Sequence, residues 1–184
     1  TQLNLFLKLA TSSKQLPDVS KNLRIGNALI DDKSVDPKAF DWEKAFLEKF
    51  DVIIGNPPYL NIQLLEENTR QYFRQNYQRV YMKRFDAYGL FIDKGISLLI
   101  DGGLFGMIVP STMLNNITFT KLRKLILDLT TISQIVNLGG KIFQNVNNDT
   151  QILLFKNTST LAFDTEIHDV PKYGGGIDTA RKIN

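Results

Sequence analysis

Residues 51–60, with the sequence DVIIGNPPYL, hold the side chains with the clearest capacity for chemistry. The apolar run 52–54 ends in a Gly-Asn-Pro-Pro turn, which is how a buried parallel strand stops at an active-site edge. Two successive prolines can neither continue an α-helix nor donate to the hydrogen-bond ladder of a sheet, so a stiff, extended loop follows Asn56. That loop fixes an amide, a backbone carbonyl and the Tyr59 ring. Two acceptors and one stacking face suit an amino group on a planar ring; an ordinary strand-terminating turn is the alternative.

The composition is that of a globular protein with one sizeable core. The chain has 184 residues, of which 43% are apolar and 22% charged. It contains no cysteine, which excludes disulfides, cysteine nucleophiles and zinc-thiolate sites. The net charge of +3 is compatible with a polyanionic partner. No apolar run approaches the roughly 18–20 residues that span a bilayer. We expect a cytoplasmic protein with no membrane or metal site, and His168 at the surface, outside any site.

Hydrophobic patterning predicts an α/β protein. Helical spacing covers residues 1–11, 86–99 and 119–129, and polar, partly helical connections cover 32–50 and 61–85. Strands are predicted at residues 23–30, 50–54, 104–109, 132–138 and 150–155. This alternation predicts a mostly parallel sheet, with the last two strands as an antiparallel pair at one edge. Asn27 and Asn56 each follow a strand, so we expect both to line one crevice.

Five segments, taken in their order along the chain, carry a resemblance to a known family. They are residues 23–30, the Asn-Pro-Pro-Tyr loop, and residues 86–91, 99–115 and 140–155. The set resembles the adenine-N6 DNA methyltransferases, specifically the type IIG restriction–modification methylases. The resemblance covers residues 1–157. It implies a Rossmann-like sheet with strand order 3-2-1-4-5-7-6, S-adenosylmethionine as cofactor, and double-stranded DNA from which the target base is flipped.

The resemblance also implies roles for individual residues. Asn56, Pro57, Pro58 and Tyr59 form the catalytic loop, in which the Asn56 side-chain oxygen and the Pro57 carbonyl accept the two adenine amino hydrogens. By the same resemblance, Asn27, Asn56 and Pro58 contact the cofactor. Tyr59 and Phe143 stack on the flipped adenine, although an aromatic residue like Phe143 near a strand is more often part of a core.

The family's glycine-rich cofactor loop is not found in this sequence. Gly174, Gly175 and Gly176 are no substitute, because they follow no strand and open no helix. We therefore interpret residues 1–157 as the C-terminal two-thirds of a catalytic domain, and residues 158–184 as a linker or the start of a following region. The isolated chain is expected to be inactive.

A basic and aromatic segment follows the catalytic loop. Its cations are Arg70, Arg74, Arg79, Lys83 and Arg84, interleaved with Tyr72, Phe73, Tyr77 and Tyr81. Such a pattern suits a phosphate backbone and an unstacked strand. An amphipathic helix whose tyrosines pack inward explains it about equally well.

Two other functions compete with this interpretation. Asn-Pro-Pro-Tyr also occurs in enzymes that methylate a glutamine amide of proteins, but those follow it with an acidic, glycine-rich stretch that residues 60–84 lack. The second alternative is a non-catalytic DNA-binding fragment. A restriction or specificity subunit or domain is a further expected partner.

Overall fold

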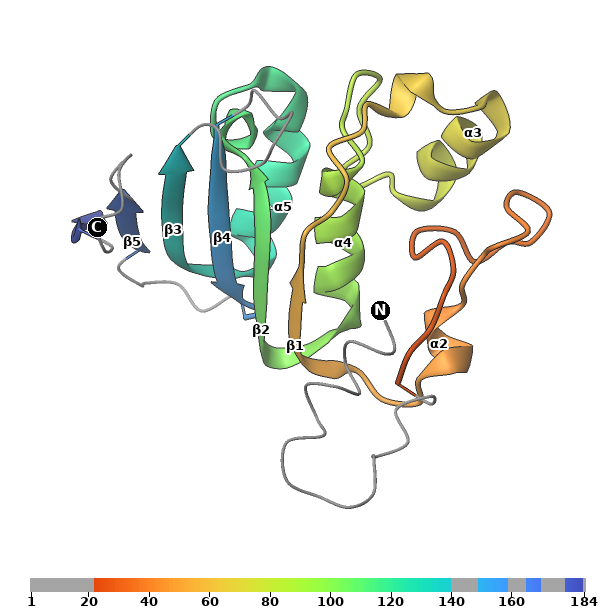
Figure 1. Cartoon of the computed structure of the whole chain (residues 1–184), viewed down its shortest axis with the longest axis horizontal. Helices are drawn as coiled ribbons and strands as arrows, with labels where there is room; N and C mark the ends of the chain where they lie inside the picture. The colour runs from red at the N-terminus through yellow and green to blue at the C-terminus, as the bar shows by residue number, and fades with distance from the viewer. Residues whose placement is uncertain (1–21, 140–148, 159–164, 170–177, 184) are drawn as a thin grey trace, which may run out of the picture. The chain divides into compact units, whose positions relative to one another are not determined.

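The computed structural model describes residues 22–139, 149–158, 165–169 and 178–183. The chain divides into two compact units, residues 1–45 and 46–184. The described part of the first unit contains one short helix, α2 (Trp42–Ala45), and the second unit contains the sheet (Figure 1). Phe143 and the glycine run 174–176 lie outside the described residues, as does the helix predicted at residues 1–11.

The described part of the sheet has six strands in the order β1-β2-β4-β3-β5-β6. They are β1 (Phe50–Gly55), β2 (Leu99–Pro110), β3 (Thr131–Gly139), β4 (Thr150–Lys156), β5 (Thr165–Asp169) and β6 (Asp178–Ile183). β1, β2, β3 and β5 run in one direction, and β4 and β6 run in the other. The predicted mostly parallel sheet is confirmed. When β1, β2, β3 and β4 are matched to the family's strands 4, 5, 6 and 7, their order in the sheet is the expected 4-5-7-6.

The predictions for the C-terminal strands and for His168 need correction. β3 and β4 are antiparallel neighbours as expected, but they do not form the edge, because β5 pairs with β3 and β6 pairs with β5. No strand was predicted after residue 157. His168 on β5 is partly buried and its Nε2 lies 3.4 Å from the Glu166 carboxylate, so it is not the exposed surface residue expected.

The predicted strand at residues 23–30 is wrong, because the segment turns at Asn27. The Asn27 side-chain oxygen accepts a hydrogen bond from the Leu29 amide (3.1 Å), and its backbone carbonyl accepts one from the Ile30 amide (3.3 Å). The strand pairing of Asn27 is limited to an isolated bridge to Ala39. A side chain that bonds its own backbone two residues on replaces a ladder partner with a local turn. Within the same unit, the Trp42 indole donates to the Ala28 carbonyl (2.9 Å).

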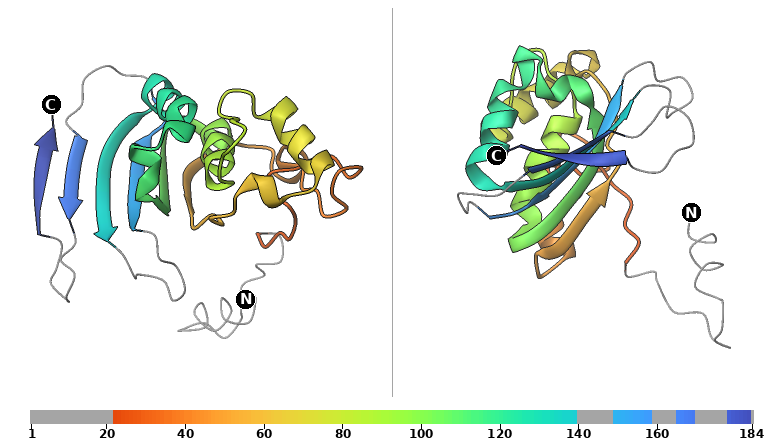
Figure 2. Two further views of the ribbon diagram at one scale, coloured as in Figure 1. Left: turned by 90° about the horizontal axis from the view of Figure 1, so that it is seen from above. Right: turned by 90° about the vertical axis from the view of Figure 1, so that its left-hand side faces the viewer.

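Helices α4 (Tyr88–Leu98) and α5 (Thr120–Leu129) cover one face of the sheet (Figure 2). Their buried residues recur at helical spacing, among them Ile92 and Ile96 on α4 and Leu122 and Ile126 on α5. α4 approaches β2 closely at Gly95, where an added Cβ would lie 2.4 Å from the Phe105 ring. Phe105 stacks on Phe155 of β4 with a centroid distance of 4.3 Å. This core fixes β2 and β4 beneath the helices.

Shorter helical segments connect the sheet to the predicted site. α3 (Glu67–Asn76) lies in the polar stretch after the Asn-Pro-Pro-Tyr loop, preceded by the 3-10 helix η1 (Ile62–Leu64). Two further 3-10 helices, η2 (Ser111–Leu114) and η3 (Ile117–Phe119), join β2 to α5. Both the loop after β1 and η2 after β2 therefore begin at the carboxyl ends of neighbouring parallel strands, where open α/β sheets bind ligands.

Candidate active site

The Asn-Pro-Pro-Tyr loop leaves the carboxyl end of β1 with its amide exposed. Pro57 is buried and anchors the loop, whereas Asn56 and Pro58 are exposed. Within the described part of the chain, the Asn56 side chain has no hydrogen-bond partner. The amide oxygen is thus available to accept a hydrogen bond from a substrate, on a backbone that two prolines stiffen.

The loop is closed at its far end by a backbone pairing that we call the neck. The Ala87 amide donates to the Leu60 carbonyl (2.7 Å), and the Ile62 amide donates to the Phe85 carbonyl (3.0 Å). Asn61 and Asp86 face each other across this antiparallel bridge. The loop is therefore held at one end by β1 and at the other by the start of α4.

Tyr59 is held by two contacts within this frame. Its hydroxyl donates to the Ile108 carbonyl of β2 at 3.1 Å. Its ring packs edge-on against Tyr88, with centroids 6.2 Å apart and planes at 80°. Partial burial raises the pKa of the Tyr59 hydroxyl, so this group stays a neutral donor. The ring is positioned before any substrate binds.

Tyr88 is a residue whose place here sequence reasoning missed. It is fully buried, and its ring stacks on Phe119 with centroids 5.0 Å apart and planes at 27°. Burial raises the pKa of its hydroxyl strongly, and the Asp86 carboxylate and Tyr59 add to that shift. Burial likewise raises the pKa of Asp86. The sequence signal for Tyr88 is its place in the segment 86–91, at the start of a predicted helix.

Asn27 belongs to the first unit, and its side chain is engaged within that unit. The amide nitrogen donates to the Asp36 carboxylate at 2.8 Å, and this hydrogen bond is the main cause of the lowered pKa of Asp36. An amide has two donor hydrogens and two acceptor lone pairs, so capacity for a ligand remains. A shared crevice with Asn56 and a role toward the cofactor stay predictions.

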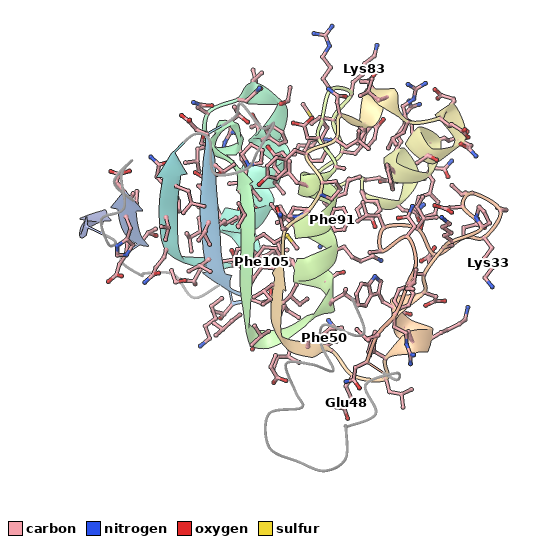
Figure 3. All side chains as sticks on the ribbon, in the orientation of Figure 1. Lys33, Glu48, Phe50, Lys83, Phe91 and Phe105 are labelled. Carbon is pink, nitrogen blue, oxygen red and sulfur yellow. The ribbon has the colours of Figure 1, made fainter. Side chains whose placement is uncertain are left out.

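The basic segment separates into two groups of cations. Arg70 binds Glu67 and the Gln63 carbonyl, and Arg79 binds Asp93 on α4. The other three side chains are exposed: Arg74, Lys83 and Arg84. Figure 3 shows Lys83 projecting away from the ribbon.

The aromatic residues of this segment mostly pack inward. Tyr72, Phe73 and Tyr77 are buried, and Tyr81 is partly buried. This arrangement favours the amphipathic-helix interpretation for the buried aromatics. The prediction of DNA contacts therefore concerns the exposed cations rather than these rings.

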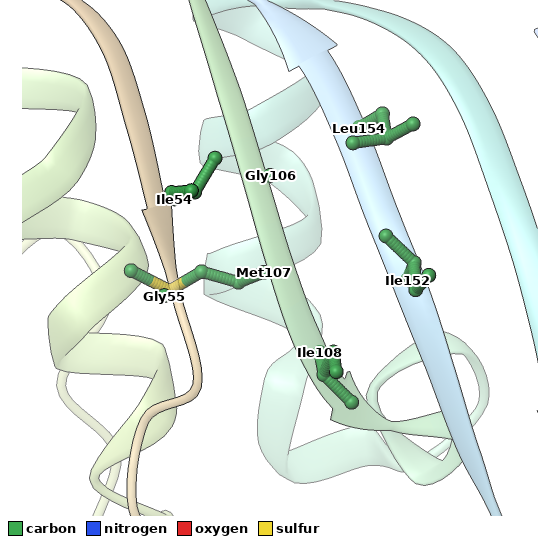
Figure 4. Close-up of a pocket in the computed structure, with 7 residues that line it drawn as sticks. All are labelled: Ile54, Gly55, Gly106, Met107, Ile108, Ile152 and Leu154. Carbon is green, nitrogen blue, oxygen red and sulfur yellow. The ribbon is translucent and has the colours of Figure 1, made fainter. Parts of the chain in front are cut away.

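A hollow of about 420 Å³ lies on the sheet face opposite Phe105, beside the start of the loop (Figure 4). Ile54, Gly106 and Leu154 form one row across β1, β2 and β4, and Ile108 and Ile152 form the next. Ile54 is 80% exposed. The lining is apolar, so the hollow offers packing surface rather than reacting groups.

Two features are absent from the described residues. No group of three histidine, cysteine, aspartate or glutamate side chains there could hold a metal ion. None of the described helices is both long and apolar enough to cross a membrane.

The fold of this chain is similar to that of solved methyltransferases and restriction–modification enzymes. The DNA-bound type IIL restriction–modification enzyme MmeI aligns with 82% of this chain and 20% of its own, with a TM-score of 0.61 and 13% identity. The EcoKI M protein of a type I restriction enzyme aligns with 82% of this chain and 30% of its own, with a TM-score of 0.55 and 21% identity.

Sequence comparison gives the family. The profile of the Eco57I restriction-modification methylases matches residues 1–143. RM.Eco57I of Escherichia coli, a type II restriction enzyme and methyltransferase, is 32% identical over 168 residues, which are 86% of this chain and 17% of that relative. The chain belongs to the Eco57I restriction-modification methylase family. It spans only a small part of the length of such relatives.

Proposed function

We propose that this chain is part of the catalytic domain of a DNA methyltransferase that methylates adenine N6 within a restriction–modification system. The observation that carries the proposal is the arrangement of Asn56 and Tyr59. An amide without a partner among the described residues stands at the end of a parallel strand, three residues before a stacking ring fixed at both its hydroxyl and its edge. Family membership supports the same activity.

The chemistry assigned to the loop is positioning and electrostatic stabilisation. The adenine amino group is a poor nucleophile because its lone pair is delocalised into the ring. Hydrogen bonds to the Asn56 side-chain oxygen and the Pro57 carbonyl draw the two amino hydrogens out of the ring plane, which localises that lone pair on nitrogen. Acceptors aimed at the charge that develops during reaction lower the barrier without a strong base.

The residues of this chain fit the nucleoside side of S-adenosylmethionine. That cofactor supplies an activated methyl group on sulfonium sulfur, which a nitrogen displaces without a metal. Asn56 and Pro58 are exposed on the loop and, with Asn27, are the residues assigned to hold the cofactor. Because the sequence has no glycine-rich loop for the methionine portion, we propose that this chain alone is inactive and binds the cofactor weakly.

Target adenine reaches such a loop only when it is flipped out of the duplex, which costs a few kcal/mol of stacking. Tyr59 offsets that cost by stacking, at about 1–3 kcal/mol per base. Phe143 is assigned to the opposite face of the base. Arg74, Lys83 and Arg84 are the exposed cations assigned to DNA phosphates, with Arg70 and Arg79 as weaker candidates because both have internal partners.

A restriction activity or specificity subunit is the proposed partner, by analogy with the combined restriction enzyme and methyltransferase among its relatives. A cytoplasmic location belongs to the same proposal, since the substrate is cellular DNA.

The test is to identify the methylated product. DNA from cells that express the complete gene product should contain N6-methyladenine in one sequence context, as read by single-molecule sequencing and mass spectrometry of nucleosides. Cells with the Asn56→Ala protein should lack it. Methylated glutamine in a cellular protein, with unmodified DNA, would reassign the loop to the protein-methylating class.

A further inference from the structure

Four aromatic rings form a connected column beneath the catalytic loop. Phe85 contacts Phe119 at 5.2 Å, Phe119 stacks on Tyr88 at 5.0 Å, and Tyr88 meets the edge of Tyr59 at 6.2 Å. Phe85, Phe119 and Tyr88 are almost completely buried, and only Tyr59 reaches the surface. The orientation of the exposed ring is therefore set by a buried support.

The Tyr88 hydroxyl in this column has no hydrogen-bond partner among the described residues, although the side chain is 0% exposed. A buried phenol without a partner costs about 1–3 kcal/mol, which phenylalanine would avoid at the same packing volume. A hydrogen bond to a neighbouring group would remove this cost. The Thr112 side chain, on η2, lies close enough to this phenol to lower its pKa, although the two groups do not meet in hydrogen-bond geometry.

We propose that Tyr88 is a positioning residue for base flipping, which holds the Tyr59 ring edge-on and links it to η2 when the target base is in place. The inference rests on the proposed function. Tyr88 is covered completely, so it acts through Tyr59 rather than by touching the base. Its ring sets the plane of Tyr59, and its hydroxyl donates to Thr112 in the bound state.

Two neighbouring features suit this role. The hydroxyl of Tyr59 is tied to Ile108, two residues before Pro110, and η2 begins directly after that proline. The neck fixes Asp86 and Ala87, immediately before Tyr88, through backbone pairing with the loop. Tyr88 thus stands between the loop after β1 and the segment after β2.

The test uses the complete gene product and a duplex that carries 2-aminopurine at the adenine the wild-type protein methylates. Fluorescence reports the flipped fraction, anisotropy reports DNA binding, and single-turnover kinetics report methyl transfer. Tyr88→Leu should lower the flipped fraction by about two- to tenfold, the range expected for loss of one aromatic pair. Tyr88→Phe should also lower it, while its melting temperature equals or exceeds that of the wild type. DNA affinity should change little in both variants.

The controls are Phe105→Leu, a buried aromatic in the same helix–sheet core, and Tyr77→Phe, a buried tyrosine in another segment. Both should leave the flipped fraction unchanged below their melting temperatures. In a Tyr59→Ala background, Tyr88→Leu should have no further effect, because the residue it positions is gone.

A flipped fraction that stays at the wild-type value in both Tyr88 variants overturns the inference. Additive losses in the Tyr59→Ala background overturn it too, because they indicate a general structural role. A wild-type protein that methylates no adenine would instead overturn the proposed function, so the two failures are distinguishable.

Discussion

The guanidinium of Arg79 binds the carboxylate of Asp93 at 2.5 Å, and that carboxylate is almost completely buried within α4. The pair connects the end of the basic segment to the helix that starts at Tyr88. Arg79 is therefore engaged in an ion pair with a buried carboxylate, although half of its own side chain is exposed and its spacing in the sequence matches that of the other exposed cations. A buried carboxylate that loses its partner is strongly destabilising.

Removal of the exposed cations should weaken DNA binding without affecting folding. We expect Arg74→Ala, Lys83→Ala and Arg84→Ala each to reduce the slope of log affinity against log salt by up to about one unit. Arg79→Ala should mainly lower the melting temperature. Fluorescence anisotropy across a salt series, with thermal melts alongside, separates these effects. An unchanged salt slope in the triple variant would show that DNA binds elsewhere.

Asp93 should make stability depend on pH in a specific window. Burial raises its pKa above the ordinary 3.8, with Arg79 opposing that shift. The native state therefore holds the proton more tightly than the unfolded state, so this group's contribution to stability falls as pH rises from about 3.8 through the raised pKa. The pH profile of the urea midpoint for Asp93→Asn should lack that component. Arg79→Ala should move the window to higher pH, because the opposing charge is lost.

Asn56→Ala should abolish methyl transfer while binding of the cofactor and of DNA stays largely intact. The amide acts on the amino nitrogen as it reacts, so its loss should appear mainly in kcat, with a cost of about 3–4 kcal/mol. Single-turnover kinetics and anisotropy provide the measurements. Asn68→Ala, on the exposed surface of α3, is the matched control and should leave both unchanged. Near-normal turnover of Asn56→Ala would contradict the assignment.

Substitutions of Tyr59 should lower methylation activity in two steps. Tyr59→Phe keeps the ring but removes the hydrogen bond to Ile108, so we expect a decrease in methylation equivalent to about 0.5–1.5 kcal/mol. Tyr59→Ala removes stacking as well and should cost about 1–3 kcal/mol more. A mismatch opposite the target adenine should partly restore activity, because an unpaired base flips at lower cost. If the mismatch gave no rescue, Tyr59 would not act on base flipping.

Gly95→Ala should destabilise the sheet-facing side of α4. The added Cβ would meet the Phe105 ring at 2.4 Å, so we expect a cost of about 1–3 kcal/mol from overpacking. Phe105→Leu in the same protein should recover part of it, since the smaller side chain makes room. Melting temperatures of the two single variants and the double variant test this coupling. Strict additivity would mean that the backbone absorbs the contact.

Local hydrophobic pattern was sufficient where burial decides the structure. β2, β3, β4, α4 and α5 each bury apolar residues and were found from their spacing, although β2 begins at Leu99 rather than at residue 104. β1 was found from an equally apolar run, but the expectation that it is buried is wrong, because most of its residues are exposed, with Ile54 at 80%. At residues 23–30 the apolar pattern was similar, but the Asn27 side chain satisfies the backbone locally and a turn forms instead. Side-chain hydrogen bonding of this kind leaves no trace in hydrophobic periodicity.

Features that depend on distant pairing could not be predicted. β5 is polar, and it is held by ladder bonds to β3 and by the Gln134–Glu166 hydrogen bond at 3.0 Å. The pairing of Arg79 with Asp93 and the contact of Tyr88 with Tyr59 likewise join residues that are far apart in the sequence. The Asn-Pro-Pro-Tyr loop was predictable because proline stiffness and strand termination are local properties.

The neck has a consequence for how this protein varies and how it can be engineered. Residues 62–85 leave and return through two adjacent backbone hydrogen bonds, so their ends are fixed whatever lies between them. Each doubling of such an excursion costs only about 0.6 kcal/mol of closure entropy. Tyr72, Phe73, Tyr77 and Phe85 within it are buried, so these core positions must be kept. Insertions or a grafted reporter peptide can instead be placed at the exposed Glu66, between η1 and α3, without displacing Tyr59 or Tyr88.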